Sequence, residues 1–405
     1  MNTVATTASA SAAAAAKPTA IAVPRIGSID LMRGIVMIIM AIDHVRDFLS
    51  PFPWDPTDLS KASAGLFLTR WITHYCAPTF VFLAGSSAFL YARNTGASRG
   101  ALQRFLVSRG LWLVLLELTF ISFGWRFDFN GLVLQVIWAI GWSMVALAGL
   151  LYLPLPAIVG VGLVMVFGHN LLDGIHSKDF ADPAAAWGWD LFHELHFGTL
   201  ASGYQILVLY PLVPWIGVMA LGYGFGQVLL LPQDQRDRWM LRLGLAALAL
   251  FLVLRLSQVY GDPSPWAVNP RGPVYTVLSV LNVTKYPPSL LYLLMTLGTV
   301  LLLLPLLERW KGAWAQRISV FGRVPFFYYL IHLPLVHLIG VLYMKSVSSA
   351  AVVGPPNVPP PPGYEPSMLR LYLVWAVVIL ALYFPCRWYA GYKLRHKHYW
   401  WLSYL

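Results

Sequence analysis

The sequence predicts an all-α integral membrane protein, a polytopic bundle of about ten transmembrane helices with both termini in the cytoplasm. Two observations carry this prediction. Hydrophobic residues make up 58% of the chain and charged residues only 11%, whereas soluble domains are usually about 25% charged. In addition, apolar runs of about 20 residues recur along the chain, which is the length of helix that crosses a bilayer.

These runs divide the chain into a tail and one membrane domain. Residues 1–24 are rich in Ala, Ser and Thr and lack the apolar core of a secretory signal, so we expect a disordered cytoplasmic tail. Residues 25–405 are expected to form a single transmembrane domain. Its expected helices are 30–49, 70–92, 102–123, 131–152, 154–170, 204–229, 240–260, 288–308, 319–344 and 368–391. The fifth is the shortest and begins at a proline-rich junction.

The Lys and Arg residues indicate how these helices are oriented. With the N-terminus inside, 18 of the 28 lie at the cytoplasmic ends and 8 at the outer ends, while Arg46 and Arg255 fall within helices. Cytoplasmic loops are enriched in positive charge, so this distribution supports an even number of helices and cytoplasmic termini. The net charge of +11 does not indicate a nucleic-acid partner, because the basic residues recur in short loops and do not form one patch.

The first helix carries the residues most suggestive of chemistry. Arg33, His44 and Asp47 recur at spacings that place them on one helical face, and Asp43 lies beside that face. Ionisable groups at membrane depth cost roughly 2.5–3.5 kcal/mol each and usually face a cavity or each other. Asp43 and His44 are therefore candidates for an acid–base pair, although neighbours on a helix do not face each other. The alternative is that Asp43, Arg46 and Asp47 cap the helix end and that His44 is a core residue.

Three further histidines are candidate site residues. His74 begins the second helix at about the depth of His44, where the two could act as acid and base. His332 is expected near the middle of the membrane in the ninth helix, and His337 follows it five residues later. The alternative for each is an ordinary interfacial or core histidine. No metal is expected, because residues 193–196 (His-Glu-Leu-His) lack the HExxH spacing of helical zinc sites.

Four segments resemble the motifs of a known family. They are Arg25-Ile-Gly-Ser-Ile-Asp-Leu-Met-Arg-Gly34 followed by Met40 and Asp43-His44, Pro78-Thr-Phe-Val-Phe-Leu-Ala-Gly-Ser-Ser87, Lys285-Tyr-Pro-Pro288, and Phe326-Phe-Tyr-Tyr-Leu-Ile-His-Leu-Pro-Leu-Val-His337. They resemble the DUF1624 family, bacterial relatives of the heparan-α-glucosaminide N-acetyltransferase catalytic domain within the transmembrane acyltransferase superfamily. The resemblance spans most of the chain from Arg25 onward, and its most specific part is the first two helices.

The resemblance implies a membrane-embedded acyltransferase of the bacterial inner membrane. It would move an acyl group, expected to be acetyl, from cytoplasmic acyl-CoA to a sugar amine or hydroxyl on the outer side. The implied partners are membrane lipid, acyl-CoA and a saccharide or glycolipid acceptor, with homodimerisation left open. In the animal enzyme an asparagine occupies the place of His44 and the essential histidine comes after the first helix. This chain has no histidine between His44 and His74, so that residue is not carried over by position.

These considerations assign expected roles. His44 is the leading candidate for the catalytic base, with Asp43 or Asp47 tuning it and His74 or His332 assisting. The candidate CoA-binding residues are Arg33, Arg104, Arg109 and Trp138, although helix orientation and packing also explain them. The candidate acceptor-binding residues are Arg46, Lys285, Tyr286 and His337. A proton-coupled transporter or flippase of the same fold, or a non-catalytic membrane protein, is the alternative.

Overall fold

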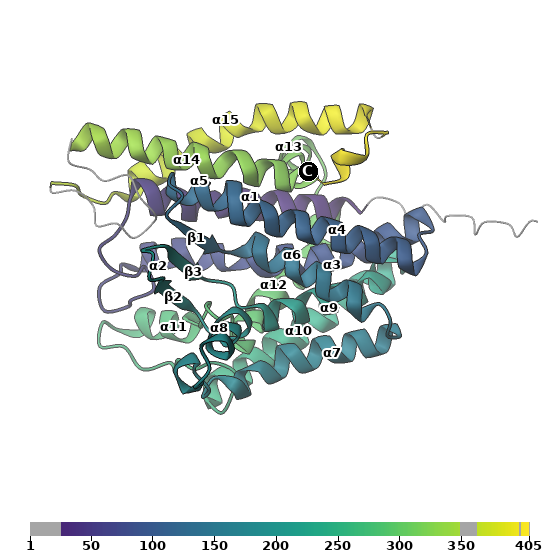
Figure 1. Cartoon of the computed structure of the whole chain (residues 1–405), viewed down its shortest axis with the longest axis horizontal. Coiled ribbons are helices and arrows are strands. Elements are labelled where there is room, and N and C mark those ends of the chain that lie inside the picture. The colour runs from purple at the N-terminus through teal and green to yellow at the C-terminus, as the bar shows by residue number, and fades with distance from the viewer. Residues whose placement is uncertain (1–25, 349–362, 397, 405) are drawn as a thin grey trace, which may run out of the picture.

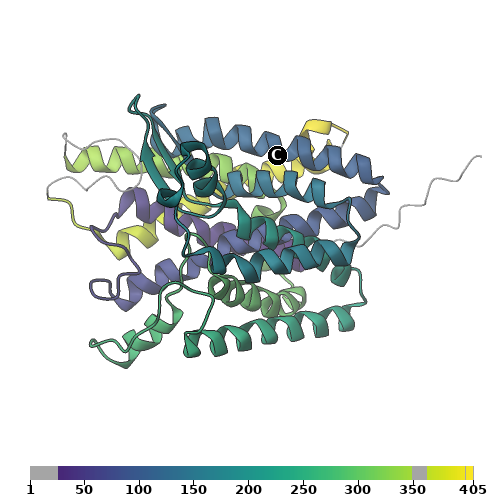
Figure 2. The ribbon, with the colours of Figure 1, turned by 60° about the horizontal axis from the view of Figure 1, so that its bottom comes forward.

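A computed structural model describes residues 26–348, 363–396 and 398–404, so the expected tail 1–24 lies outside the described residues. The long helices run side by side along one direction and form a single bundle (Figure 1). The start of the described chain and the end of its last long helix lie at the same end of the bundle, on the right of both views (Figure 2). We call this the termini end. An even number of crossings produces this arrangement.

Eight helical segments in the described ranges are long and apolar enough to cross a membrane. Three of them are composite: α2 (Ala64–Ile72), η1 (Thr73–Tyr75) and α3 (Cys76–Thr95); α4 (Arg99–Leu116), the π-helix η2 (Glu117–Ile121) and α5 (Ser122–Arg126); and α7 (Leu155–Gly168) with η3 (His169–Leu172). The others are α9 (Leu212–Leu229), α10 (Gln233–Ser257), α12 (Leu290–Arg309), α14 (Pro325–Val347) and α15 (Met368–Arg395). The protein therefore has the build of a multi-pass membrane protein.

Two of the expected crossings are absent from this set, for different reasons. Helix α1 (Gly27–Leu49) is long enough, but it carries five charged residues, namely Asp30, Arg33, Asp43, Arg46 and Asp47. Helix α6 (Val136–Leu150) is apolar but only 15 residues long. A total of ten crossings therefore stays a prediction.

The structure corrects three of the expected helix boundaries. Residues 131–134 and 205–208 were expected within helices but form strands β1 (Gly131–Leu134) and β3 (Gln205–Val208), which pair in parallel. Strand β2 (His196–Thr199) pairs with β3 in the antiparallel sense and completes the sheet. A short apolar run alone does not distinguish a buried strand from a helix. The expected helix 319–344 is two helices, α13 (Ala313–Arg323) and α14, because Pro325 prevents α13 from continuing.

The segments between crossings add structure mainly at the end opposite the termini. Residues 173–211 contain η4 (Ser177–Asp179), helix α8 (Pro183–Phe192) and the strands β2 and β3. Helix α11 (Pro273–Leu281) lies between α10 and α12, and η5 (Trp400–Ser403) comes after α15. The sheet, α2 and α11 lie in the left part of Figure 1.

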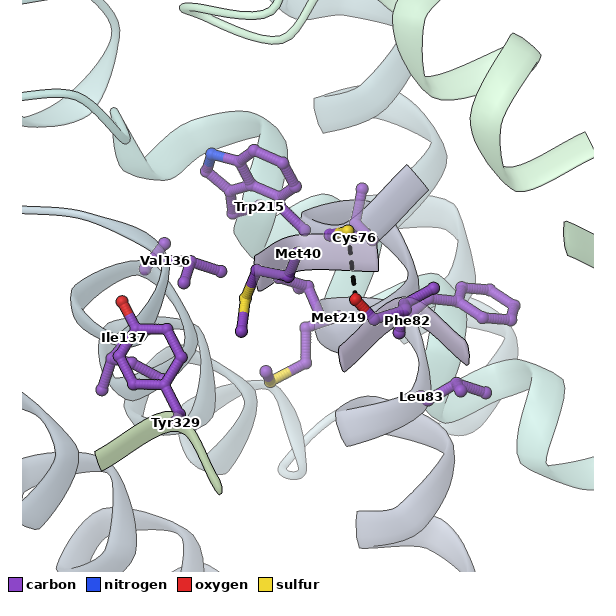
Figure 3. Close-up of a cluster of buried hydrophobic side chains, with 14 of the residues drawn as sticks. Met40, Cys76, Phe82, Leu83, Val136, Ile137, Trp215, Met219 and Tyr329 are labelled. Atoms are coloured by element: carbon purple, nitrogen blue, oxygen red, sulfur yellow. Dashed lines mark hydrogen bonds between the residues drawn. The ribbon is translucent and has the colours of Figure 1, made fainter. Parts of the chain in front are cut away.

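Helix α1 lies inside the bundle. It ends at Leu49 because Pro51 and Pro53 come next, and neither can continue a helix. Most of its side chains are buried, and it packs against α3, α12, α13, α14 and α15. Two neighbours hydrogen-bond its backbone: Trp375 Nε1 donates to Ile38 O at 2.8 Å, and Cys76 Sγ donates to Val36 O at 3.3 Å, the dashed line in Figure 3. Other helices therefore surround α1 along most of its length.

Helices α3 and α9 approach each other closely at a pair of glycines. A Cβ at Gly85 would lie 2.1 Å from Met219 O, and one at Gly222 would lie 2.1 Å from Phe82 O. Ser86 Oγ crosses this contact and donates to Gly222 O at 2.9 Å. Small residues that let two backbones approach are the usual means of packing helices in a membrane. The Gly-Ser-Ser motif thus has a structural role in fixing α3.

The close approach predicts that Gly85→Ala destabilises the protein. The added methyl group would meet backbone and could be accommodated only by separating α3 from α9, which costs about 1–3 kcal/mol. The expected result is a lower thermal unfolding temperature in detergent. Gly160→Ala in α7 is the matched control, because a Cβ there meets nothing within 4 Å and alanine favours a helix. Equal unfolding temperatures for the two variants would contradict the packing argument.

Candidate active site

A cavity of about 680 Å³ lies where α1 ends, and we call it the His44 cavity. Its walls come from the second half of α1, the 51–56 segment, the start of the α2–α3 segment, α5, the start of α6, the 207–210 segment, the 285–286 turn and α14. The polar and charged side chains on these walls are Asp43, His44, Arg46, Asp47, Asp55, Arg70, Thr73, Gln135, Tyr210, Lys285, Tyr286 and Tyr329. Aromatic side chains, among them Phe52, Trp54 and Trp125, make up much of the remainder.

Asp43 is the centre of the charge network on this wall. Its Oδ1 accepts from Arg46 Nη1 at 2.6 Å, and its Oδ2 accepts from Arg70 Nη1 and, at 2.7 Å, from Thr73 Oγ1. Lys285 Nζ lies 3.8 Å from the same oxygen. Arg46 also donates to Asp47 Oδ1 at 2.7 Å. One buried carboxylate therefore joins α1 to the α2–α3 segment and to the turn that precedes α12.

His44 is paired with His332. His44 Nδ1 and His332 Nε2 are 2.6 Å apart, and His332 Nδ1 lies 3.1 Å from Tyr328 O and 2.9 Å from Tyr329 O. A carbonyl oxygen only accepts, so His332 Nδ1 carries the proton and its Nε2 accepts from His44 Nδ1–H. This assignment leaves a lone pair on His44 Nε2, which has no hydrogen-bond partner among the described residues. His44 can therefore take up a proton from a molecule in the cavity.

The hydrogen-bond partner of His44 is not the neighbouring carboxylate. Asp43 was a candidate to orient or tune His44, but its hydrogen bonds go to Arg46, Arg70 and Thr73. Adjacent residues on a helix point about 100° apart, which separates the two side chains. Asp47 is likewise bound to Arg46 rather than to His44. The residue that orients the imidazole is His332, from a helix 288 positions later in the chain.

A second cavity, of about 430 Å³, lies on the termini end of the first, and we call it the Arg33 cavity. Its walls come from the first half of α1, from α3, α4, α6 and α14, from the last two residues of α13 and from one residue of α15. Its charged lining residues are Asp30, Arg33, Arg109, Arg323 and Lys393. Arg33 is held by Leu83 O at 3.0 Å and by the hydroxyl of Ser87, which is the last residue of the Gly-Ser-Ser motif.

The two cavities meet at a wall with three residues in common. Phe80, Val136 and Tyr329 line both of them. Figure 3 shows Tyr329 and Val136 on the same side of Met40, with the ring of Tyr329 beside Ile137. The two cavities therefore adjoin at these three side chains.

The cavities differ in charge. Three cations and three carboxylates line the His44 cavity, whereas four cations and one carboxylate line the Arg33 cavity. The Arg33 cavity therefore favours an anion and the His44 cavity favours a polar molecule of low net charge. At the mouth of the His44 cavity, burial would raise the pKa of Tyr286, but the positive charges of Lys285 and Arg70 outweigh burial and lower it.

The structure places two of the candidate histidines away from both cavities. His74 is buried, its Nδ1 lies 3.0 Å from Arg70 O, and its ring contacts Tyr292. His337 is buried between the rings of Phe48 and Phe127, with Nδ1 2.8 Å from Gly124 O. Neither lines the His44 cavity or the Arg33 cavity. The catalytic role of His74 and the acceptor contact of His337 stay predictions, and the contacts described for both residues are packing contacts and hydrogen bonds to backbone.

The remaining candidates divide in the same way. Arg33 and Arg109 line the Arg33 cavity, while Arg46, Asp47, Lys285 and Tyr286 line the His44 cavity. Arg104 is exposed on α4, on a different face from Arg109, and Trp138 is buried but lines neither cavity. The expected CoA contacts of Arg104 and Trp138 therefore stay predictions that these two cavities do not support.

Sequence reasoning missed three residues that belong to the site. Arg70 binds Asp43, Trp125 packs edge-on to His44 with 4.9 Å between ring centroids, and Tyr329 lines both cavities. The π-helical turn η2 adds a residue to the helix before Trp125 and so rotates the remainder of that helix by roughly 100°. Because of that rotation, Trp125 does not recur at the three- or four-residue spacing that would have placed it on one helical face with polar residues of α4. Tyr329 was noted only as part of a motif.

The network around Asp43 predicts a strong effect of Asp43→Asn. The substitution leaves Arg46, Arg70 and Lys285 buried with one carboxylate fewer, and removing one member of a buried ion pair costs about 3–5 kcal/mol. We expect a marked loss of thermal stability and of yield in detergent. Asp47→Asn is the control, because Asp47 is more exposed and pairs with Arg46 alone, a contact worth about 1 kcal/mol or less. A milder effect at Asp43 than at Asp47 would contradict this account.

A comparison with family models gives a match over residues 25–257. The matching family is described as heparan-alpha-glucosaminide N-acetyltransferase, catalytic. The match covers more than half of the 405-residue chain and includes α1, the α2–α3 segment and the π-helical turn. No curated protein matches the chain.

Proposed function

We propose that this chain, which belongs to the heparan-alpha-glucosaminide N-acetyltransferase catalytic family, transfers an acetyl group from acyl-CoA to a sugar amine or hydroxyl. The observation that carries the proposal is the pair of cavities that meet at Phe80, Val136 and Tyr329. A donor and an acceptor that occupy separate cavities with a common wall can react without passing each other. Holding both in one complex removes the entropic cost of their encounter.

The Arg33 cavity suits the donor. CoA carries phosphates, and four cations with one carboxylate give this cavity the opposite charge. A volume of about 430 Å³ holds only part of the coenzyme, so the pantetheine arm and the thioester would fill the cavity, the phosphates would meet the cations that line it, and the adenosine would extend beyond it. The thioester would then lie at the inner end, next to the common wall.

The His44 cavity suits the acceptor. It is larger, balanced in charge and lined by both hydrogen-bonding and aromatic side chains, among them Trp54 and Phe52 at its mouth. Sugars combine hydroxyl or amine groups with apolar ring faces, and so they use both kinds of contact. His44 Nε2 would face the attacking amine or hydroxyl.

The proposed chemistry is built on the histidine pair. His44 Nε2 takes the proton of the acceptor N–H or O–H while the acceptor atom attacks the carbonyl carbon of the thioester. The C–S bond then breaks, and the CoA thiolate takes the proton from His44. His332 Nε2, by accepting from His44 Nδ1–H, stabilises the imidazolium that forms between these steps. Transfer through an acyl-histidine would use the same nitrogen.

We further propose that the donor binds from the cytoplasm and the acceptor from the outer side of a bacterial inner membrane. The Arg33 cavity lies toward the termini end, and the helix ends assigned to that side carry most of the Lys and Arg residues. Positive charge accumulates on the cytoplasmic side of membrane proteins. An anionic donor would thus meet its cavity on the side where acyl-CoA is made.

The first test is transfer by purified protein in detergent. Given acetyl-CoA and a sugar amine such as glucosamine, the wild type should release the free thiol of CoA and form the acetylated sugar. His44→Ala should lower the rate by about 10²–10⁴-fold, because it removes the general base, while acetyl-CoA still binds. An unchanged rate in His44→Ala would remove His44 from the mechanism. Uptake of unmodified sugar into vesicles with no thiol release would favour a transporter instead.

The second test concerns the donor site. Arg109→Ala should raise the KM for acetyl-CoA by about tenfold, the loss expected from one charge-assisted contact, with kcat largely retained. Arg104→Ala is the matched control on the same helix, because Arg104 is exposed and lies outside the cavity. Equal KM values for the two variants would place the donor elsewhere.

A further inference from the structure

Three residues line both cavities, and Tyr329 is the one of them whose side chain carries a hydrogen-bonding group, a hydroxyl. Tyr329 is 2% exposed, and its Oη has no hydrogen-bond partner within the described parts of the chain. Several other Tyr and Trp donors in the described ranges also lack a partner, so what distinguishes Tyr329 is its position on the wall that both cavities share.

A second unsatisfied donor lies next to the first. Trp125 lines the His44 cavity and is 2% exposed, and no described residue accepts from its Nε1. It lies near enough to the Tyr329 hydroxyl to interact with it, but without the geometry of a hydrogen bond. Both rings stand edge-on to His44, with centroids 4.9 Å away for Trp125 and 6.5 Å away for Tyr329.

We propose that the O–H of Tyr329 and the N–H of Trp125 form the oxyanion hole of the transfer reaction. This inference rests on the proposed acyl transfer. As the acceptor nitrogen or oxygen bonds to the carbonyl carbon of the acetyl thioester, the C=O π electrons move onto the oxygen, and both donors point their hydrogens at it. The C=O bond re-forms when the C–S bond breaks, and the CoA thiolate leaves with the proton that His44 had taken. No oxidant, reductant or further reactant is needed.

The positions of the Tyr329 hydroxyl and the Trp125 N–H support a role in catalysis rather than in packing alone. The thioester has to reach the common wall for an acceptor in the other cavity to attack it, and Tyr329 belongs to that wall. The nucleophile has to lie beside His44, and Trp125 is in contact with His44. Donors that are held in place without a partner require no reorganisation when charge develops on the oxygen.

Other unsatisfied buried donors provide matched controls. Tyr389 Oη on α15 and Trp215 Nε1 on α9 are also buried and have no partner in the described ranges. Neither residue lines either cavity. Substituting these residues removes the same chemical group from the same kind of environment, but away from the proposed site of transfer.

The kinetic test compares Tyr329→Phe and Trp125→Phe with Tyr389→Phe and Trp215→Phe. Each of the first two variants should lower kcat by about 10²–10³-fold, the usual effect of removing one oxyanion donor, with the KM for acetyl-CoA changed by less than about threefold. The controls should keep kcat within about threefold of the wild type. Rates in Tyr329→Phe and Trp125→Phe equal to those of the controls would overturn the proposal.

The binding test uses two CoA analogues and needs no turnover. One is a methyl ketone in which CH2 replaces the thioester sulfur, so that the carbonyl is retained; the other is S-ethyl-CoA, which has no carbonyl. Tyr329→Phe should weaken the ketone by up to about tenfold and leave S-ethyl-CoA unchanged, because only the ketone accepts the lost hydrogen bond. Equal changes for the two analogues would indicate a structural effect and contradict the proposal.

Different results would contradict the proposed acyl transfer and the proposed oxyanion hole. If wild-type protein binds neither analogue and releases no CoA, the proposed acyl transfer itself is wrong. If the wild type transfers acetyl groups and Tyr329→Phe does so at the same rate, only the oxyanion hole is wrong. Thermal unfolding of each variant identifies loss of fold, and the ratio of the two analogue affinities reports on the residual folded protein alone.

Discussion

The buried carboxylate of Asp43 is the interaction on which the arrangement of the site depends. Arg46, Arg70 and Lys285 come from three different segments and share this one anion. Inside a membrane such cations are tolerated only when they are paired, so the position of Asp43 determines where the α2–α3 segment and the turn before α12 can lie. Asp43 is bound to these cations. His44, the next residue on the helix, points in another direction and pairs with His332.

The two halves of α1 line different cavities. Its termini-end half carries Arg33, which the backbone of Leu83 and the hydroxyl of Ser87 hold in the wall of a cation-rich cavity. Its opposite half carries the charge network and the histidine with a free lone pair. One helix therefore contributes to both cavities, and the proposed donor and acceptor are aligned by the rigidity of a single element rather than by the docking of two domains.

The sequence alone predicted the membrane bundle and most helix positions, because apolar length is a local property. It also singled out His44, because an ionisable group at membrane depth usually faces a cavity or a partner, and His44 does line a cavity. It could not predict the pairing of His44 with His332, which are 288 positions apart. Depth along a helix also gave no information on which side chains surround His74 and His337, which are covered by Tyr292 and by Phe48 and Phe127. The strands β1 and β3 were missed for a similar reason, since their pairing partners lie about 75 residues apart.

The three side chains that line both cavities also affect whether ions can pass through the protein. If the cavities open to opposite faces of the membrane, as proposed, a water-filled connection between them would leak protons and small ions. The side chains of Phe80 and Val136 contain only carbon and hydrogen, so they offer an ion no ligands. Tyr329 adds an aromatic ring with one hydroxyl. A path that excludes ions but lets a two-carbon acyl end reach across is narrow in cross-section. The same three side chains would therefore limit both the electrical leak of the protein and the bulk of the group that it can transfer.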